Sequence, residues 1–241
     1  MPEKAEFSPL ELTGRTRAHV VDLQEPRCTL HREVVGPFLA LRASAASAGI
    51  DLVPVSSFRD FQRQQLIWNG KCRGERELLD REGRQLDPAH LDQDGLIGAI
   101  LLWSALPGAS RHHWGTDMDV IDAAAIAAGG KVRLEPAEYA PGGSFNRLNN
   151  WLDENAARFG FYRPYAVDRG GVLPEPWHLS YAPLAQQAMA ALSVAVLEAA
   201  LAAEGIDGLD AVRSRLPEIV ARYVMNVEAP PLDAIPGTRR A

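Results

Sequence analysis

Apolar side chains recur along the chain at the spacings of helices and of strands. Over residues 32–48 they fall three or four positions apart, which predicts a helix that ends before Gly49. The same pattern predicts helices beginning near Asp60 and over residues 96–106, 146–159, 184–203 and 209–225. Short alternating or aromatic-rich runs predict strands at residues 18–23, 51–57, 116–122, 161–165 and 177–181. Since unequal helices and long turns separate these strands, we expect an α+β fold, with a small, mostly antiparallel sheet flanked by helices.

The order of these elements predicts one domain over residues 1–225. Residues 71–109 are charged and rich in turns, with a hairpin tip at residues 80–84, so we expect an insertion that decorates the core. Helices over residues 184–225 follow the last strand. Residues 226–241 hold three prolines and a glycine, and we expect a loose tail there.

Composition narrows the class of protein. The chain has 241 residues, a net charge of −6 and 46 % hydrophobic residues, which is typical of a globular protein and argues against a nucleic-acid binder. Cys28 and Cys72 form no CxxC pair. No apolar run approaches the ~20 residues of a membrane span, and the N-terminus lacks a signal-peptide pattern. We therefore expect a cytoplasmic location, or a periplasmic one if an export signal is missing from this sequence.

Two segments carry an unusual set of polar residues. Residues 110–119 read SRHHWGTDMD, and residues 175–181 read EPWHLSY. Together they offer two imidazoles, a ligating carboxylate and a spare carboxylate. A catalytic zinc site needs the same inventory: three protein ligands, an open position for water and a nearby base.

Spacing limits how these residues can meet. His112 and Asp119 are seven positions apart, so on one regular strand they would point to opposite faces. A turn must therefore separate them, and Gly115 is well placed for it. On the strand that follows, Asp117 and Asp119 share one face. Spacing alone leaves open which of the two carboxylates binds a metal.

These segments resemble the two motifs of the D-alanyl-D-alanine carboxypeptidase (VanY-like) branch of the LAS zinc peptidases, SxHxxGxAxD and ExxH. The residues that match are Ser110, His112, Gly115, Asp119, Glu175 and His178, and Trp177 is also common in the family. Asp117 departs from the pattern, because a small residue is usual at that position. Residues 56–64, SSFRDFQRQ, are similar to a third family stretch, SGYRSxxxQ, with Ser57 for Gly and Phe58 for Tyr.

The resemblance implies a role for each matching residue. One zinc ion per chain would be held by His112, Asp119 and His178, and Glu175 would act as the general base. Arg59 would bind the substrate or the developing oxyanion. Three further residues are implied to contact the substrate or shape its pocket: Ser110, Gln64 and Trp177. His113 is expected to lie beside the site or to be exposed.

The family also implies a hedgehog-like fold and a substrate class. We expect a zinc metallocarboxypeptidase that removes the terminal D-alanine of peptidoglycan stem peptides or their precursors in the cell wall. The alternatives are an L,D-carboxypeptidase acting on recycled muropeptide tetrapeptides and a dipeptidase restricted to free D-Ala-D-Ala. A different class remains as well: a non-catalytic zinc-containing module that binds peptidoglycan or a partner.

Overall fold

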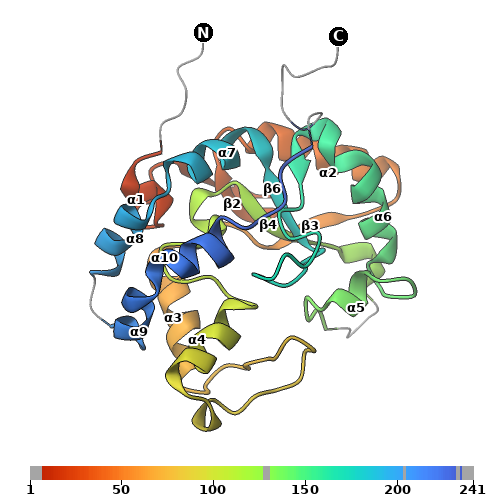
Figure 1. The fold of residues 1–241 in the computed structure, drawn as a ribbon. Helices are drawn as coiled ribbons and strands as arrows, with labels where there is room; N and C mark the ends of the chain where they lie inside the picture. Colours follow the sequence, from red (N-terminus) through yellow and green to blue (C-terminus); the bar gives the residue numbers. More distant parts are fainter. Residues whose placement is uncertain (1–6, 127–130, 203–204, 232–233, 235–241) are drawn as a thin grey trace.

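The computed structural model describes residues 7–126, 131–202, 205–231 and 234 (Figure 1). Its main sheet has four antiparallel strands in the order β3–β4–β6–β5. They are β3 (Leu52–Ser56), β4 (Asp117–Asp122), β6 (His178–Tyr181) and β5 (Phe161–Tyr162). A separate hairpin pairs β1 (Val20–Gln24) with β2 (Arg27–His31). With helices around the sheet, this arrangement confirms the α+β prediction.

Each of the longer helices overlaps a helix that periodicity predicts. They are α2 (Val35–Ser47), α3 (Phe61–Cys72), α4 (Gln93–Leu101), α6 (Asn146–Asn155), α7 (Ala182–Ala191) and α8 (Val194–Leu201). The shorter ones are α1 (Pro9–Leu12), α5 (Pro136–Tyr139), α9 (Leu209–Ser214) and α10 (Leu216–Ile219). Asp60 begins α3 as predicted, because its side chain accepts a hydrogen bond from the backbone N–H of Arg63.

Three predictions of local structure are wrong. Residues 184–203 do not form one helix: the Ser193 hydroxyl accepts a hydrogen bond from the Val196 N–H and starts a second helix, bent by 78° from the first. No strand was predicted at residues 27–31, but these residues form β2, and Cys28 and Leu30 of β2 are buried in the core. The strand expected at residues 161–165 has only two residues.

Two clusters of buried apolar residues make up most of the core. One lies between the sheet and helices α2 and α6 and includes Phe38, Leu148 and Val120. The other lies among α3, α4, α8 and α10 and includes Trp68 and Ile100. The prediction that residues 71–109 only decorate the core is therefore wrong in part, because the apolar side of α4 belongs to this second cluster.

The C-terminal segment departs in part from the loose tail that we expected. The N–H of Glu228 donates to the carbonyl of Pro164 at 2.8 Å, and the Glu228 carboxylate pairs with Arg169. Ala234 is buried. Residues 226–231 are thus attached to the body of the protein, and residues 232–233 and 235–241 of the expected tail lie outside the described residues.

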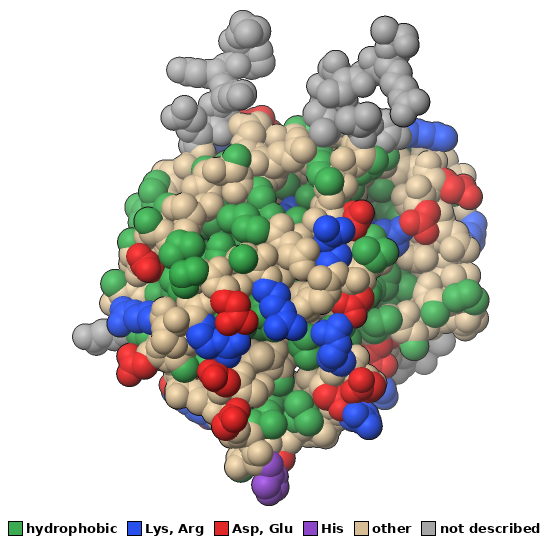
Figure 2. All heavy atoms as spheres, viewed as in Figure 1, with side chains coloured by type: hydrophobic (Ala, Val, Ile, Leu, Met, Phe, Trp, Pro, Cys, Tyr) green, Lys and Arg blue, Asp and Glu red, His purple; other side chains and the backbone are tan. Residues whose placement is uncertain are grey.

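Surface and helix composition add two observations. On the face shown in Figure 2, acidic and basic side chains lie interspersed. Among the described residues, no single helix has the length and apolar composition of a membrane span, and only the bent pair of α7 and α8 meets that test when taken together.

We expect Gly115→Ala to destabilise the protein more than a matched glycine substitution. Gly115 has a φ of 67°, and a Cβ there would lie 2.6 Å from Val20 Cγ1 and 2.7 Å from the backbone nitrogen of His31. Gly142 has a φ of 88° and nothing within 4 Å of its Cβ position, so Gly142→Ala carries only the cost of backbone strain, about 1–2 kcal/mol. Urea unfolding of both variants measures the difference. Equal losses of free energy would show that the contact with β1 and β2 is unimportant.

Candidate active site

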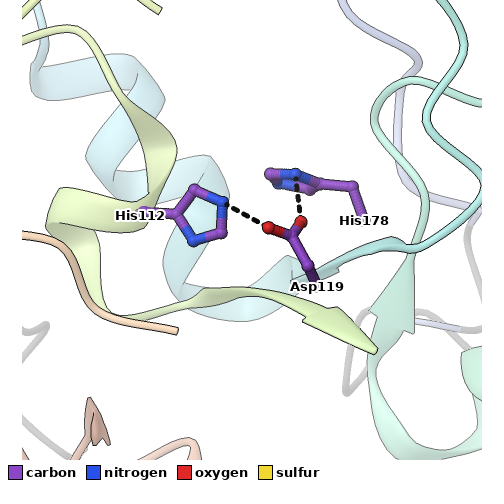
Figure 3. Close-up of side chains that lie close together, drawn as sticks. All are labelled: His112, Asp119 and His178. Carbon is purple, nitrogen blue, oxygen red and sulfur yellow. Dashed lines mark ion pairs between the residues drawn. The ribbon is translucent and has the colours of Figure 1, made fainter. Parts of the chain in front are cut away.

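The structure brings together the three residues expected to bind a metal. His112, Asp119 and His178 each offer one ligand atom, and these atoms lie within 4.8 Å of one another (Figure 3). His112 comes from the short helical turn Arg111–Trp114, Asp119 from β4 and His178 from β6. Gly115 ends that turn in the left-handed conformation, which is the bend that the spacing of His112 and Asp119 requires. In the antiparallel register of β4 and β6, Asp119 lies directly opposite His178.

Hydrogen bonds set which nitrogen of each histidine faces the cluster. His112 Nδ1 lies 2.9 Å from the carbonyl oxygen of Ser57 and donates to it, so Nε2 is left facing Asp119 at 3.4 Å. His178 Nε2 lies 3.0 Å from Asp117 Oδ1 and donates to it, so Nδ1 faces Asp119 Oδ1 at 3.3 Å. Each imidazole therefore presents an unprotonated nitrogen to one common point when it is neutral.

Unpartnered polar atoms test whether this cluster fits a metal. Three buried side-chain atoms in the described residues lack a hydrogen-bond partner: His19 Nδ1, Asp119 Oδ1 and His178 Nδ1. Two of the three belong to the cluster, where a bound cation would satisfy both. Two imidazoles and one carboxylate are also a donor set that zinc accepts while keeping a position open for water. The residues fit a zinc ion.

The charges around the cluster stabilise its carboxylates. Burial alone would raise the pKa of Asp119, but His112 and His178 beside it hold that pKa well below its ordinary value. Burial would likewise raise the pKa of Asp117, and the Arg111 guanidinium and His178 lower it. Both carboxylates are therefore ionised at neutral pH.

Glu175 and Arg59 lie on two different loops, and both line the cavity beside His112, Asp119 and His178. Glu175 precedes β6, where its N–H donates to the Tyr165 carbonyl, and its Oε2 lies 3.2 Å from His178 Nδ1. The N–H of Arg59 donates to the carbonyl of His112 at 3.2 Å, which ties the 56–64 segment to the turn that carries a ligand. Both side chains line one cavity of about 640 Å³ with His112, Asp119 and His178.

The three residues expected to contact the substrate lie in different environments. Ser110 and Trp177 line the cavity. Ser110 precedes the 111–114 turn, but its side chain makes no capping hydrogen bond, so its hydroxyl is available to the cavity. Gln64 does not line it: its side chain is fully buried, accepts a hydrogen bond from Arg59 Nη1 at 2.8 Å and donates to the carbonyl of Ala105. The position of Gln64 supports a role through Arg59 rather than direct contact with substrate.

His113 lies beside the site and is fully buried, not exposed. Its Nδ1 donates to the carbonyl of Arg59, and its Nε2 accepts the N–H of Gly108 at 3.1 Å. Burial lowers the pKa of His113 to about 3, so the ring is neutral. Both ring nitrogens are engaged, and neither faces the cluster.

Two residues that sequence reasoning did not select also lie at the site. The ring of Tyr165 packs edge-on against His178, with centroids 5.0 Å apart, and lines the cavity. Arg111 forms a buried ion pair with Asp117 at 2.8 Å. The position of Arg111 next to His112 was a signal for its role, whereas nothing in the local sequence marks Tyr165.

Comparison with known proteins identifies a family and several relatives. The family model for VanY, D-alanyl-D-alanine carboxypeptidase, matches residues 27–184. Two uncharacterized proteins of Haemophilus influenzae are 48 % identical over 103 residues and 39 % identical over 122 residues, covering 42 % and 50 % of this chain and 70 % and 93 % of their own lengths. A D-alanyl-D-alanine carboxypeptidase of Enterococcus faecalis is 29 % identical over 151 residues, which are 61 % of this chain and 46 % of that enzyme.

Two of the solved structures to which this chain is partly similar are a vancomycin resistance D,D-pentapeptidase and VanYB. The D,D-pentapeptidase VanY in complex with Zn(II) is 25 % identical, with a TM-score of 0.48, and the match covers 67 % of this chain and 77 % of that one. VanYB in complex with D-alanine-D-alanine is 23 % identical, with a TM-score of 0.49 and coverage of 77 % and 89 %.

We expect purified protein to bind about one zinc ion per chain and to lose it when a ligand is removed. His112→Ala, Asp119→Ala and His178→Ala should each lose most of the metal, because two protein ligands hold zinc poorly. Elemental analysis after gel filtration measures the zinc content. His113→Ala is the matched control and should keep zinc once circular dichroism has shown that it is folded. Full zinc content in His178→Ala would mean that the metal binds elsewhere.

Proposed function

Because the chain belongs to the VanY family of D-alanyl-D-alanine carboxypeptidases, we propose that it is a zinc-dependent D,D-carboxypeptidase. The proposed reaction removes the terminal D-alanine of peptidoglycan stem peptides or of their precursors. The observation that carries the proposal is that one cavity is lined by three residues that fit a metal ion, a further carboxylate and a guanidinium. The three residues, His112, Asp119 and His178, are called the triad below, and the other two groups belong to Glu175 and Arg59. Each of these groups has a separate task in hydrolysing a peptide bond.

The triad and Glu175 account for the attack on the peptide bond. A zinc ion held by His112, Asp119 and His178 would supply Lewis acidity for water and for the scissile carbonyl. Glu175 takes a proton from the attacking water and returns it to the leaving amine. Its carboxylate lies 3.2 Å from His178 Nδ1, within reach of a water molecule beside the triad, and its side chain is only 13 % exposed.

Arg59 stabilises the negative charge that develops on the carbonyl oxygen. Ser56 Oγ accepts a hydrogen bond from Nη2 at 3.0 Å, and Gln64 accepts one from Nη1 at 2.8 Å. These two bonds hold the planar guanidinium in one orientation at the cavity wall before substrate arrives. A preorganised cation stabilises an oxyanion without the cost of reorienting during the reaction.

A purely binding role is disfavoured by the same residues. A module that only binds a partner needs neither a base beside the metal nor a fixed cation at the cavity. Here Glu175 and Arg59 both line the cavity with the triad. The exact bond that is cleaved depends on the substrate, so it is the subject of the test.

Mass spectrometry of zinc-loaded protein with three substrates tests the proposal. A stem pentapeptide ending in D-Ala-D-Ala should lose one D-alanine. A tetrapeptide ending in a single D-alanine and free D-Ala-D-Ala are the comparison substrates. Cleavage of only the tetrapeptide would make the protein an L,D-carboxypeptidase, and cleavage of only the dipeptide would make it a dipeptidase. Binding of the peptides without cleavage would overturn an enzymatic role.

We expect Glu175→Gln to keep zinc and to lose turnover, because glutamine preserves shape but cannot accept a proton. The kcat should fall by about 10²–10⁴-fold, the usual scale for losing general acid–base catalysis. Glu77→Gln is the matched control, since Glu77 also lines the cavity and should leave kcat unchanged. A near-normal kcat in zinc-loaded Glu175→Gln would assign the base to another residue.

Arg59 substitutions separate charge stabilisation from substrate binding. If Arg59 stabilises the oxyanion, kcat should fall in both Arg59→Lys and Arg59→Ala, by about 10²–10³-fold in the alanine variant, while zinc stays bound. Lysine keeps the charge but loses the fork that Ser56 and Gln64 hold. Arg63→Lys, on the exposed side of α3, is the control. A raised KM with unchanged kcat would show instead that Arg59 binds substrate and transition state equally.

A further inference from the structure

Asp117 is the residue at which this chain departs from the motif that it otherwise matches, and it contacts a metal ligand. We propose that the buried Asp117–Arg111 pair positions His178 and strengthens its Nδ1 as a metal ligand. The inference rests on the proposed function only for the identity of the ligand triad. It assigns to Asp117 a task that a small residue at the same position cannot perform.

Three donors converge on the Asp117 carboxylate. Oδ1 accepts from His178 Nε2 at 3.0 Å and from Arg111 Nε at 2.8 Å, and Oδ2 accepts from the hydroxyl of Thr116. Asp117 is fully buried, and His178 is only 3 % exposed. With three partners and no access to water, the carboxylate has one arrangement available, so the ring that it holds is fixed as well.

The strand register creates this contact. Asp119 lies opposite His178 and Asp117 lies opposite Ser180, so all four side chains occupy one face of β4 and β6. Asp117 is then the diagonal neighbour of His178. Asp119 meets the ring at Nδ1 and Asp117 meets it at Nε2. The two carboxylates of β4 therefore contact the same imidazole at its two different nitrogens.

Arg111 makes it feasible to bury a second negative charge at the site. Besides Asp117, its guanidinium donates to Ser180 Oγ at 2.7 Å and to the Tyr162 hydroxyl at 3.1 Å, and it lies 4.7 Å from the centre of the Trp114 ring. Arg111 is 2 % exposed. An unpaired buried carboxylate would be costly, and this cation, which is itself hydrogen-bonded through Nε and Nη2, compensates for it.

The consequence concerns how strongly His178 binds a metal. A carboxylate that accepts the distal N–H of a ligating histidine fixes the tautomer and the ring orientation and makes the other nitrogen a stronger donor. His112 has only the neutral carbonyl of Ser57 in that role. The two histidines are thus unequal, and His178 is the stronger ligand of the two.

The zinc affinity of Asp117→Asn tests this inference directly. Asparagine keeps the size of the side chain and a carbonyl acceptor but removes the charge, so the zinc dissociation constant, measured by chelator competition, should rise by about 10–100-fold. In the zinc-loaded protein, the proton resonance of His178 Nε2–H should move upfield as its hydrogen bond weakens. Asp122→Asn is the matched control, because Asp122 is buried on the same strand but accepts backbone N–H groups of Asp51 and Ala124.

A double variant distinguishes the loss of the Asp117 charge from a loss of folding. Asp117→Asn leaves Arg111 without its ion pair, so Arg111→Met/Asp117→Asn removes both charges and should fold with the same loss of zinc affinity. The inference is overturned if zinc affinity and the His178 resonance stay unchanged in a folded variant, or if Asp122→Asn weakens zinc binding equally. Peptide hydrolysis by the wild-type protein is a separate result: its absence would overturn the proposed function, and the affinity difference would still establish the role of Asp117.

Discussion

The antiparallel register of β4 and β6 is the constraint on which the site depends. It sets Asp119 opposite His178 and Asp117 opposite Ser180. One face of these strands is therefore apolar and includes Met118 and Val120, and the other face carries two carboxylates and an imidazole. A slip of one residue would move these carboxylates into the core. The apolar face packs in the core, so the packing that stabilises the fold also fixes the ligands.

Hydrogen bonds to backbone carbonyls connect the metal ligands to residues that are far away in the sequence. The N–H of Arg59 donates to the carbonyl of His112, and the carbonyl of Arg59 accepts from His113 Nδ1. The Ser57 carbonyl accepts from His112 Nδ1. These three bonds join the 56–64 segment to the ligand turn, so the guanidinium and the metal ligands are positioned by the same structure. Positioning of this kind is what electrostatic catalysis requires, because the charges are already in place when substrate binds.

Much of this arrangement could be predicted from sequence, and the exceptions have physical reasons. Strong periodicity predicted α2 and α3 well, and the spacing of His112, Gly115 and Asp119 required the turn that the structure shows. The break at Ser193 was missed because apolar residues recur at helical spacing on both sides of it, and that spacing does not reveal the capping hydrogen bond that starts the second helix. The position of Gln64 behind Arg59 and the contact of Asp117 with His178 depend on tertiary packing and strand register, which motif spacing does not specify.

We expect one metal position in this protein, defined by Nε2 of His112, Nδ1 of His178 and a carboxylate oxygen of Asp119. A crystal structure of the zinc-loaded protein, with anomalous scattering measured at the zinc edge, tests it most directly. We expect one strong anomalous peak about 2.0–2.2 Å from these three atoms, with Asp117 still bonded to His178 Nε2. A peak bonded to His178 Nε2 or to Asp117, or one located away from β4 and β6, would contradict it.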